Sequence, residues 1–522
     1  MKVCTVVQMR ELDKQASVDL SIAMLMENAA SAVAAVVCRE LKDERNKSVA
    51  VLCGRGNNGG DGLAVARLLH CRGFRVFLFV TDLEPTGDCA AQLRAATACG
   101  LKAMHIPASL DAIQAAITES AVVVDAIFGS GLSRPIRWAT PLGQVIAMVN
   151  SSGKVVVAVD IPSGVEGDSG IVREAGVIAS TTVTFGLPKI GNILNLTNQG
   201  RLLCDPLSFP PLMTCNFQVA VFDSAAVPLP PRNPGGHKGS FGKALFIAGS
   251  NDYFGAARFS SVVFLRAGGG YARLACPERC MQNVSAPQLV MHMLNGVTHD
   301  NVQWLADLAN SQDFVVVGPG LGLNCDSGAL SRLISSIRVP LLIDGDGLTL
   351  LAIYNLDSVS DASKSNHGRL VLTPHLGELS RLTGRSLSEM TADFTVAVEE
   401  GVRLAHKLKC TVVVKGPRTA VVSGDGRVTF NMSGNSGMGT AGSGDVLAGV
   451  IPAIYCHLRT ATSCWHDAVA KGVFLHGVAG DIAAEELGED AVTAEDILVS
   501  VGKAMKRERE GSIRDYSIPA VF

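Results

Sequence analysis

The sequence predicts an α/β protein made of two doubly wound domains. Short apolar runs recur along the chain, and each is followed by apolar residues at helical spacing, which is typical of a parallel sheet covered on both faces. The 522 residues are too many for one hydrophobic core. A stretch rich in proline and glycine, 225–240, interrupts the pattern, which then begins again. We therefore expect one domain over residues 1–225 and a second over 226–522.

Composition narrows the classes of protein. Hydrophobic residues make up 48% of the chain and charged residues 18%, which indicates compact domains and excludes disorder. A net charge of −3 offers no basic field, so no nucleic-acid partner is expected. The 14 cysteines show no zinc spacing and suggest a reducing compartment, so a cytoplasmic location is expected. No uninterrupted apolar run reaches the length of a membrane span, so no membrane partner is expected.

The first strand-turn-helix unit is "VAVLCGRGNNGGDGLAVARLL", residues 49–69. Gly54, Gly56 and Gly59 fit G-x-G-x-x-G, which brings backbone N–H groups against a pyrophosphate at a helix start. A glycine-rich turn without ligand is the alternative. The loop also holds polar residues at 57, 58 and 61, more than making room for a phosphate requires. The turn therefore predicts a dinucleotide site, and its polar residues indicate a role beyond binding the phosphates.

The next strands of the first half end in oxygen-bearing side chains. Asp125 precedes "FGSGLSRP", and Asp160 precedes "IPSG". The carboxyl ends of parallel strands meet at one edge, so Asn58, Asp125 and Ser163 are expected near one another. Such an all-oxygen set suits a hard cation, and Asp160 stays available for proton transfer. The alternative is that each aspartate only caps the following helix.

In the second half, the segment "NSGMGTAGSGDVLAGVIPAI", residues 435–454, passes from glycines into an apolar helix. The backbone N–H groups of 442–444, at the positive end of that helix, predict an anion hole for a phosphoryl group. Asp445 is placed to accept a proton from a hydroxyl. Upstream, residues 415–419 follow a strand and predict one wall of an adenine-nucleotide site. The chain lacks the P-loop pattern.

These motifs resemble a known pair of domains. "GRGNNGGDGLAVARLL", "VDAIFGSGLSRP" and "VDIPSGVEGDSG" resemble the NAD(P)H-hydrate epimerase domain. "HKGSFGKALFIAGS", "VVGPGLG", "LTPHLGELSRLTG" and "NSGMGTAGSGDVLAG" are similar to the ribokinase-like NAD(P)H-hydrate dehydratase. The order matches the fused, bifunctional hydrate repair enzymes. The resemblance implies a Rossmann-like N-terminal domain, a ribokinase-like C-terminal domain, and a dinucleotide bound as damaged substrate instead of hydride carrier.

The resemblance also implies site residues, carried over by matching motif positions. Hydrate contacts in the first domain would be Asn57, Asn58, Gly59, Gly60, Asp61, Gly129, Ser130, Gly131, Leu132, Ser133, Arg134, Pro135 and Asp160. Potassium ligands would be Asn58, Asp125 and Ser163. Hydrate contacts in the second domain would be Ala256, Gly322, His375 and Asp445. Nucleotide contacts would be Lys415, Gly416, Pro417, Arg418, Thr419, Asn435, Ser436, Gly437, Met438, Gly439, Thr440, Ala441, Gly442, Ser443 and Gly444.

The chain departs from the usual pattern in two places. Gly345 stands where the family commonly has alanine, and residues 200–211 lack the usual end of the epimerase domain. The second departure puts the edge of that domain in doubt.

The implied function is repair of the hydrates NADHX and NADPHX. Asp445 and Asp160 would be the catalytic residues, K⁺ would serve the epimerase domain, and Mg²⁺ with ADP or ATP would serve the dehydratase. We favour ADP because fusion of the two activities resembles the bacterial arrangement. A homo-oligomer is expected, since the apolar helix over 21–37 could pack against a partner.

Three alternatives remain open at this point. A small-metabolite kinase would use Asp445 to phosphorylate a vitamin alcohol. A non-catalytic N-terminal binding module would have no need of the four oxygen-bearing residues at strand ends. A nicotinamide-dependent oxidoreductase depends on the G-x-G-x-x-G pattern alone.

Overall fold

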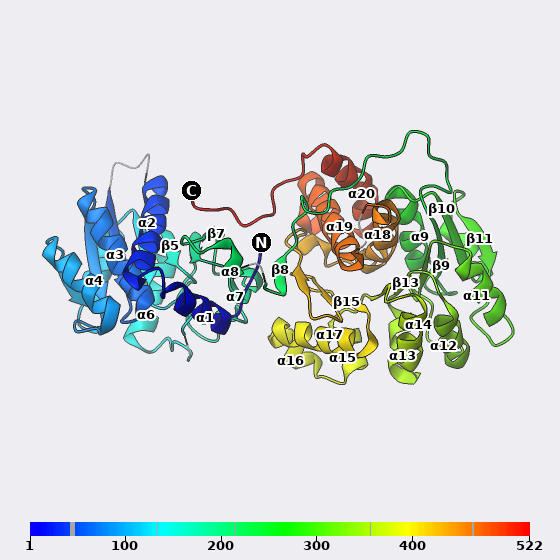
Figure 1. Ribbon diagram of the computed structural model, residues 1–522, viewed down its shortest axis with the longest axis horizontal. Coiled ribbons are helices and arrows are strands. Elements are labelled where there is room, and N and C mark those ends of the chain that lie inside the picture. Colours follow the sequence, from blue (N-terminus) through cyan, green and yellow to red (C-terminus); the bar gives the residue numbers. More distant parts are fainter. Residues whose placement is uncertain (42–46, 133, 215, 355, 462–463) are drawn as a thin grey trace. The chain divides into compact units, whose positions relative to one another are not determined.

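The computed structural model describes residues 1–522 except 42–46, 133, 215, 355 and 462–463. It divides into an N-terminal unit, residues 2–217 with 518–522, and a C-terminal unit, residues 218–517 with Met1 (Figure 1). The division after residue 217 precedes the boundary predicted at 225. The reason is a short strand, β8 (Val219–Val221), which pairs with β17 (Val428–Phe430) in the C-terminal sheet.

The N-terminal unit is built on a parallel seven-stranded sheet of order β3-β2-β1-β4-β5-β6-β7. The order reverses between β1 and β4, which confirms the predicted doubly wound class. Ligands bind such sheets where the order reverses, so the segments after β1, β4 and β5 are the ones to inspect. The strands are β1 (Ser48–Cys53), β2 (Arg75–Val80), β3 (Ala103–His105), β4 (Val122–Ala126), β5 (Val155–Val159), β6 (Thr181–Phe185) and β7 (Arg201–Asp205).

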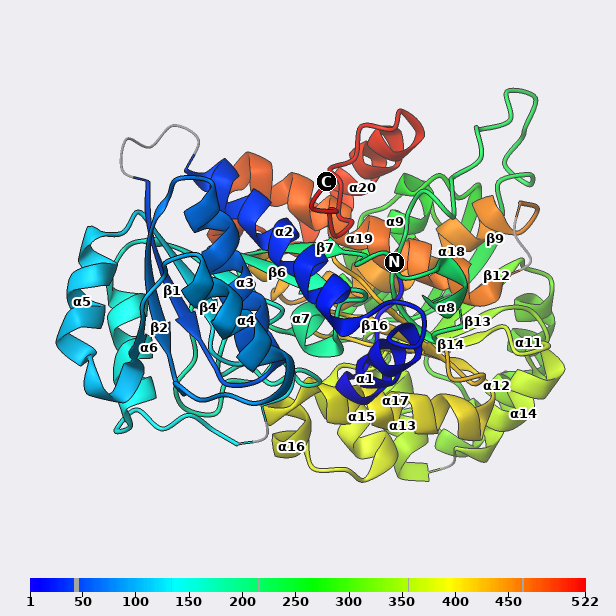
Figure 2. The same cartoon turned by 60° about the vertical axis from the view of Figure 1, so that its left-hand side comes forward.

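Helices cover both faces of this sheet (Figure 2). Along β1, Val49 and Val51 join the core beneath α2 and α3, while Ala50 and Leu52 join the core beneath α5 and α6. All six residues of β1 are buried, as a strand covered on both faces requires. The helices are α1 (Val6–Ala16), α2 (Ile22–Glu40), α3 (Asn57–Cys71), α4 (Gly87–Ala98), α5 (Leu110–Glu119), α6 (Pro141–Ser151), α7 (Ile190–Leu194) and α8 (Pro211–Thr214), with a 3₁₀ turn at Ile106–Ala108.

Among the described helices, α2 alone has the length and composition that a membrane crossing needs, and half of its apolar window is buried in the protein. Its buried residues include Ala30, Val33 and Val37, which pack in the N-terminal core. The buried face of α2 therefore packs against the core of its own unit.

The C-terminal unit contains a ten-stranded sheet of order β11-β10-β9-β12-β13-β14-β15-β16-β17-β8. The pairs β15–β16 and β16–β17 are antiparallel and the others are parallel. The order reverses between β9 and β12, so this unit is doubly wound as predicted. Besides β8 and β17, the strands are β9 (Lys243–Ile247), β10 (Tyr271–Cys276), β11 (Val290–Met293), β12 (Phe314–Val317), β13 (Leu341–Ile343), β14 (Leu370–Leu372), β15 (Thr411–Val414) and β16 (Ala420–Ser423).

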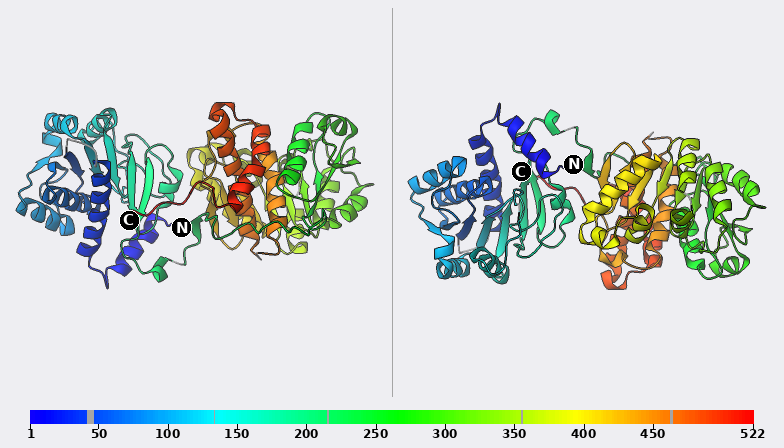
Figure 3. Two further views of the ribbon diagram at one scale, coloured as in Figure 1. Left: turned by 90° about the horizontal axis from the view of Figure 1, so that it is seen from above. Right: turned by 90° about the horizontal axis from the view of Figure 1, so that it is seen from below.

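Two helical layers enclose this sheet (Figure 3). The red and orange helices α18, α19 and α20 cover one face, and the yellow helices α15 to α17 cover the other (Figures 1 and 3). The helices are α9 (Phe254–Arg266), α10 (Glu278–Val284), α11 (Val302–Asn310), α12 (Ser327–Ser336), α13 (Asp346–Tyr354), α14 (Asp357–Ser365), α15 (Leu376–Thr383), α16 (Leu387–Ala392), α17 (Phe394–Leu408), α18 (Ser443–Leu458), α19 (Trp465–Leu487) and α20 (Ala494–Arg509), with 3₁₀ turns at Ser436–Met438 and Glu489–Ala491.

The last residues of the chain belong to the N-terminal unit, unlike the predicted span 226–522. The N–H of Cys204, in β7, donates to the carbonyl of Pro519 at 3.0 Å. Ile518 and Val521 are buried, and Val521 joins the N-terminal core. The tail therefore covers the outer edge of β7.

Candidate active sites

The N-terminal unit holds a cavity of about 670 Å³ at the carboxyl ends of β1, β4 and β5. Helices α1 and α2 supply its apolar wall through residues such as Met9 and Leu25. Most of the predicted hydrate contacts line it: Asn57, Asn58, Asp61, Gly129, Ser130, Gly131, Leu132 and Asp160. A polar loop at the strand ends that faces an apolar wall is typical of a small-molecule binding site.

The glycines after β1 serve close backbone packing. A Cβ on Gly54 would lie 1.9 Å from the carbonyl oxygen of Ile127, and one on Gly59 would lie 1.9 Å from that of Gly54. Gly60 instead faces Met26, whose terminal carbon would lie 2.7 Å from an added Cβ. Gly59 and Gly60, both predicted as contacts, therefore shape the turn from behind and do not line the cavity.

The predicted cation ligands gather around the loop that follows β4. The hydroxyl of Ser163 donates to Asp125 Oδ1 at 2.6 Å, and its N–H donates to Oδ2 at 2.7 Å. Phe128 N–H donates to the same hydroxyl at 2.9 Å. Asn58 Oδ1 accepts from Gly129 N–H at 3.2 Å once its amide is oriented to satisfy its neighbours. Complete burial raises the pKa of Asp125 to about 6.

Asp160 follows β5 and is paired with a lysine that the sequence analysis missed. Lys189 Nζ donates to Asp160 Oδ1 and, at 2.9 Å, to the hydroxyl of Thr184. Ser130 N–H donates to the other oxygen, Oδ2, at 3.1 Å. Asp160 adopts φ 67°, a left-handed conformation that points its carboxylate into the cavity loop at a cost in strain.

The charges of this site oppose one another. Burial alone would raise the pKa of Asp160, but the ammonium of Lys189 outweighs it and holds this pKa below its usual range. Lys189, only 1% exposed, keeps its charge because Asp160 raises its pKa. Asp61 lines the same cavity, and burial with the nearby carboxylates of Asp160 and Asp13 raises its pKa well above normal. The site thus offers an ionised carboxylate beside a protonated one.

The remaining predicted contacts of this unit lie elsewhere. Ser133 lies outside the described residues. Arg134 and Pro135 are exposed and are not among the described residues that line the cavity.

In the C-terminal unit, the glycine-rich segment ends directly at α18. Gly442 caps this helix with φ 91°, where a Cβ would lie 2.7 Å from the ring of Phe259. The next residues, Ser443 to Asp445, form the first turn. Ser443 N–H donates to the carbonyl of Thr440 at 3.3 Å, whereas the N–H groups of Gly444 and Asp445 point out of the helix start. This is the arrangement that anion binding requires, and Asp445 lies at its edge.

Lys415 was predicted to form one wall of the adenine site together with residues 416–419. Its side chain instead reaches the loop before α18. Its Nζ donates to Asp344 Oδ1 at 2.8 Å, and a Cβ on Gly444 would lie 3.2 Å from the same Nζ. Asp344, which follows β13, is 2% exposed. A buried ammonium therefore lies beside the N–H groups of the loop.

Four acidic groups surround this ammonium. Burial raises the pKa of Asp445 to about 7, helped by the negative charges of Asp344, Asp346 and Glu378 and opposed by Lys415. Burial likewise raises the pKa of Glu378 to about 7. Asp445 is therefore a base whose proton affinity matches neutral pH.

The other predicted hydrate contacts lie on neighbouring loops. His375 caps α15, and its ring accepts from Glu378 N–H at 3.2 Å. Gly322 N–H donates to Asp346 Oδ2 at 2.8 Å. A Cβ on Gly320 would lie 2.8 Å from Ala256, which places Ala256 against the loop after β12. These loops follow β12, β13 and β14, so His375, Gly322 and Ala256 flank one edge of the sheet.

The rest of the predicted nucleotide segments are tied to the helical layer. Asn435 Nδ2 donates to Asp481 Oδ1 at 2.8 Å, and Ser436 contacts Glu489 through its hydroxyl. Met438 packs on Gly480. Gly416 to Thr419 form the turn between β15 and β16, where the hydroxyl of Thr419 donates to the Gly416 carbonyl at 3.0 Å. The other members of these segments are Gly437, Gly439, Thr440, Ala441, Pro417 and Arg418, of which Pro417, Gly439 and Ala441 are exposed.

Three residues of the candidate sites were not predicted from the sequence: Lys189, Asp344 and Glu378. Each stands a few residues after an apolar strand, which is the signal that could have found it. Lys189 follows "TTVTF", Asp344 follows "LLI", and Glu378 sits within the "PHLGEL" stretch that was credited to His375 alone.

Comparison with known proteins covers nearly all of the chain. Residues 22–191 match the family described as YjeF-related protein N-terminus, and residues 244–501 match NAD(P)H-hydrate dehydratase. The bifunctional NAD(P)H-hydrate repair enzyme Nnr of Thermofilum pendens is 40% identical, with 98% of this chain and 97% of that protein covered. Its namesake from Moorella thermoacetica is 34% identical, with 95% of each covered, and that of Escherichia coli is 32% identical, with 90% and 87% covered.

A solved ADP/ATP-dependent NAD(P)H-hydrate dehydratase from Bacillus subtilis is 24% identical, covering 56% of this chain and 99% of that one, with a TM-score of 0.46. Two doubly wound units, one of them with a glycine-rich loop at a helix start beside an aspartate of raised pKa, define a two-domain α/β enzyme. The similarity over nearly the full length identifies the family within this class: the chain belongs to the bifunctional NAD(P)H-hydrate repair enzymes.

Proposed function

We propose that the C-terminal unit dehydrates the S hydrates of NADH and NADPH at the expense of a nucleotide, and that the N-terminal unit interconverts the R and S epimers at C6. The observation that carries this proposal is Asp445, a partly buried carboxylate whose pKa is raised to about 7, at the edge of the glycine-rich loop before α18. Two epimers form when water adds to the nicotinamide ring, and a stereospecific dehydratase would leave one of them unrepaired.

The dehydration proceeds through a phosphate ester. Asp445 accepts the proton of the 6-hydroxyl while the hydroxyl oxygen attacks the terminal phosphorus of the nucleotide. The bond between this phosphorus and the bridging oxygen breaks, and the nucleotide, shortened by one phosphate, leaves with the bridging oxygen. The ring nitrogen lone pair then expels phosphate from C6, and loss of a proton from C5 restores the dihydropyridine. The ammonium of Lys415 and the N–H groups of 442–444 stabilise the charge on the phosphoryl group.

Mg²⁺ fits this site because its carboxylates outnumber its described ammonium groups. Asp344 is already paired with Lys415, whereas no lysine or arginine among the described residues forms an ion pair with Asp346 or Glu378, and burial raises the pKa of Glu378 to about 7. Asp346 and Glu378 would hold the ion, which would neutralise phosphate charge. The positive loop and these carboxylates together favour ADP or ATP, with ADP as our choice.

In the N-terminal unit, Asp160 would move the proton that accompanies opening and closing at C6. Its pairing with Lys189 keeps it ionised and fixes its position. K⁺ fits beside it: Asp125 is a completely buried carboxylate whose described partners are the Ser163 hydroxyl and backbone N–H groups, so its charge lacks a protein cation. Asn58, Asp125 and Ser163 would hold the ion and order the loop at Gly129.

The testing experiment follows the recovery of reduced-nicotinamide absorbance from a mixture of both hydrate epimers. The mixture is incubated with ADP, with ATP, or without nucleotide. Complete recovery with a nucleotide supports both activities and names the donor. Recovery that stops when one epimer is used up would leave the N-terminal unit as a binding module. A stable phosphorylated product without recovery would point to a metabolite kinase.

Two further proposals concern the setting of the enzyme. We place it in the cytoplasm, because the described cysteines other than Cys464, among them the neighbouring pair Cys276 and Cys280, are free thiols. We also propose a homo-oligomer. Its interface would lie outside the buried face of α2, since that face is used by the N-terminal core.

A further inference from the structure

A second cavity, of about 360 Å³, lies at the other end of the C-terminal sheet. Its walls include Gly368, which precedes β14, and residues 409–411, which lead into the start of β15. His375 and Lys415, at the proposed dehydratase site, follow the ends of these same two strands. The start of α19 closes it. The cavity is therefore separate from the proposed dehydratase site and belongs to the same unit.

An arginine in this cavity has donors to spare. Arg427 contacts Asp467 at 3.4 Å and Asp425 at 3.5 Å, at the outer limit of hydrogen bonding, and contacts Cys464 Sγ at 3.2 Å. Its guanidinium carries five N–H groups. Asp425 is itself satisfied, because its Oδ1 accepts from the Ser423 hydroxyl at 2.6 Å and from Arg427 N–H at 3.2 Å.

Two buried ring nitrogens beside it lack partners among the described residues: Trp465 Nε1 and His466 Nδ1. Tyr455 and Phe314 fix the indole, with ring centroids at 5.3 and 6.0 Å. His466 is 4% exposed and contacts the Thr429 hydroxyl through Nε2 at 2.8 Å. When that hydroxyl donates to Nε2, the ring proton lies on Nδ1. Both rings line the cavity, and a buried N–H without an acceptor is costly.

The surroundings favour an acceptor that carries negative charge. Trp465 and His466 open α19, a helix of 23 residues whose start is its positive end. Lys409 also belongs to the lining. Burial lowers the pKa of His466 to about 4, so the ring is neutral at physiological pH and carries one N–H. A cavity of this size accommodates a ligand of a few heavy atoms.

We propose that this cavity is a second ligand site, which binds a small oxyanion through Arg427, the indole N–H of Trp465 and the imidazole of His466. The shared chemistry is a compact group with several acceptor oxygens. Inorganic phosphate and a short dicarboxylate both have it, and the experiment separates them.

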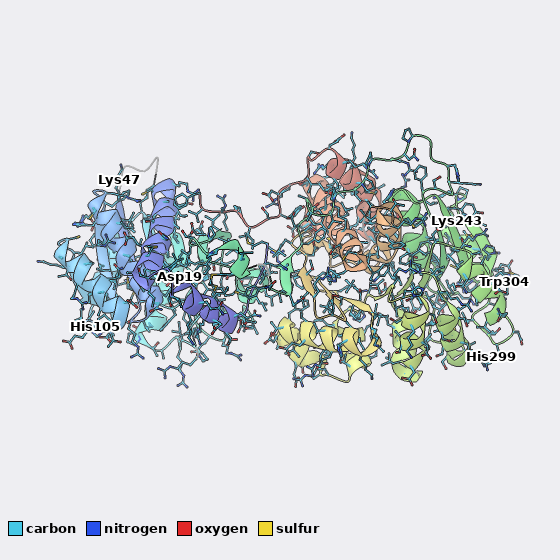
Figure 4. The ribbon with its side chains drawn as sticks, in the orientation of Figure 1. Asp19, Lys47, His105, Lys243, His299 and Trp304 are labelled. Carbon is cyan, nitrogen blue, oxygen red and sulfur yellow. The ribbon has the colours of Figure 1, made fainter. Side chains whose placement is uncertain are left out.

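The test uses the fluorescence of Trp465 in the full-length protein. The chain has three tryptophans, and Trp138 and Trp304 are both 45% exposed; Trp304 lies on the surface of α11 (Figure 4). The variant Trp138→Phe/Trp304→Phe therefore reports on Trp465 alone. It is titrated with inorganic phosphate, with malonate, and with chloride at equal ionic strength, each in the presence of saturating ADP.

We expect a saturable change in emission with phosphate or malonate and none with chloride. Arg427→Leu should weaken binding at least tenfold. Arg507→Leu is the matched control, since Arg507 is 39% exposed against 38% for Arg427 and pairs with Glu485 outside the cavity; it should bind as the parent does. A change with one oxyanion alone identifies the ligand class.

The proposal is overturned if neither oxyanion gives a saturable change, if chloride gives the same change, or if Arg427→Leu binds with unchanged affinity. If Arg427→Leu fails to fold, an NMR titration of the parent protein tests the proposal instead. The indole N–H resonance of Trp465, assigned with Trp465→Phe, must then move on oxyanion addition and saturate, and a fixed resonance refutes the site.

Discussion

Asp160 and Asp445 are both partly buried aspartates at candidate active sites, yet their pKa values move in opposite directions. The pKa of Asp160 is lowered because Lys189 pairs with it directly. The pKa of Asp445 rises to about 7 because burial acts on it while the nearest ammonium, Lys415, is held by Asp344. The comparison shows that the placement of one lysine decides whether a partly buried aspartate is permanently ionised or ready to exchange a proton.

The largest expected effect comes from removing the base itself. Asp445→Asn keeps the shape of the side chain but cannot accept the hydroxyl proton. We expect the dehydration rate to fall roughly a thousandfold, within the range of about 10² to 10⁴ typical of general-base catalysis. The measurement is absorbance recovery at saturating nucleotide. The epimerisation rate of the same variant serves as internal control and should not change. Dehydration within tenfold of normal would remove Asp445 from the mechanism.

The next largest effect is expected from Lys189→Met, which tests how much the ion pair with Lys189, as opposed to burial, controls the pKa of Asp160. Lys189→Met would leave Asp160 buried without its cation, which costs about 3 kcal/mol of stability or more. The pKa of Asp160 should then rise as that of Asp445 does, and epimerisation near pH 7 should fall roughly a hundredfold. Exchange of the two epimers, followed by NMR without nucleotide, measures this rate.

Lys471→Met is the matched control for that variant. Lys471 is completely buried and paired with Glu508, but it lies in the C-terminal unit. It should destabilise that unit and leave epimerisation unchanged. Normal epimerisation by Lys189→Met would show that the pair is structural only.

A smaller effect is expected on the stability of the N-terminal unit when the C-terminal tail is removed. Deleting residues 518–522 removes Ile518 and Val521 from burial, which should cost about 3 kcal/mol at about 1.5 kcal/mol for each side chain. The fluorescence of Trp138, as the single tryptophan, follows unfolding of the N-terminal unit. Deleting Phe522 alone is the control, because this side chain is 83% exposed. Equal stability of the two deletions would show that the tail contributes nothing.

The tail also marks the limit of what the sequence could predict. Glycines at 54, 59 and 442 were predictable because each close approach or left-handed turn excludes other residues. Asp160 and Asp445 were predictable because they follow strands or start helices. The pairing of Lys189 with Asp160, 29 positions apart, depends on how neighbouring strands align, and "SIPAVF" has no pattern that assigns it to the distant N-terminal sheet.

The last prediction compares the two aspartates in one protein by pH. Asp445 acts as a base only when deprotonated, so a pKa raised to about 7 means that dehydration should fall about tenfold per pH unit below 7 and level off above it. Asp160, with a lowered pKa, stays ionised across the same range, so epimerisation should be level from pH 6 to about 8.

Glu378 titrates near 7 as well and faces the same ammonium, so the apparent value belongs to the pair unless the two are separated. Glu378→Gln removes that second titration, one negative charge and one proposed Mg²⁺ ligand, so the profile is measured at saturating Mg²⁺, where the midpoint of dehydration should move to lower pH while its slope stays. If the midpoint vanished with Glu378 instead of shifting, Glu378 and not Asp445 would be the base. If both activities fell together below pH 7, the contrast between the two aspartates would be wrong.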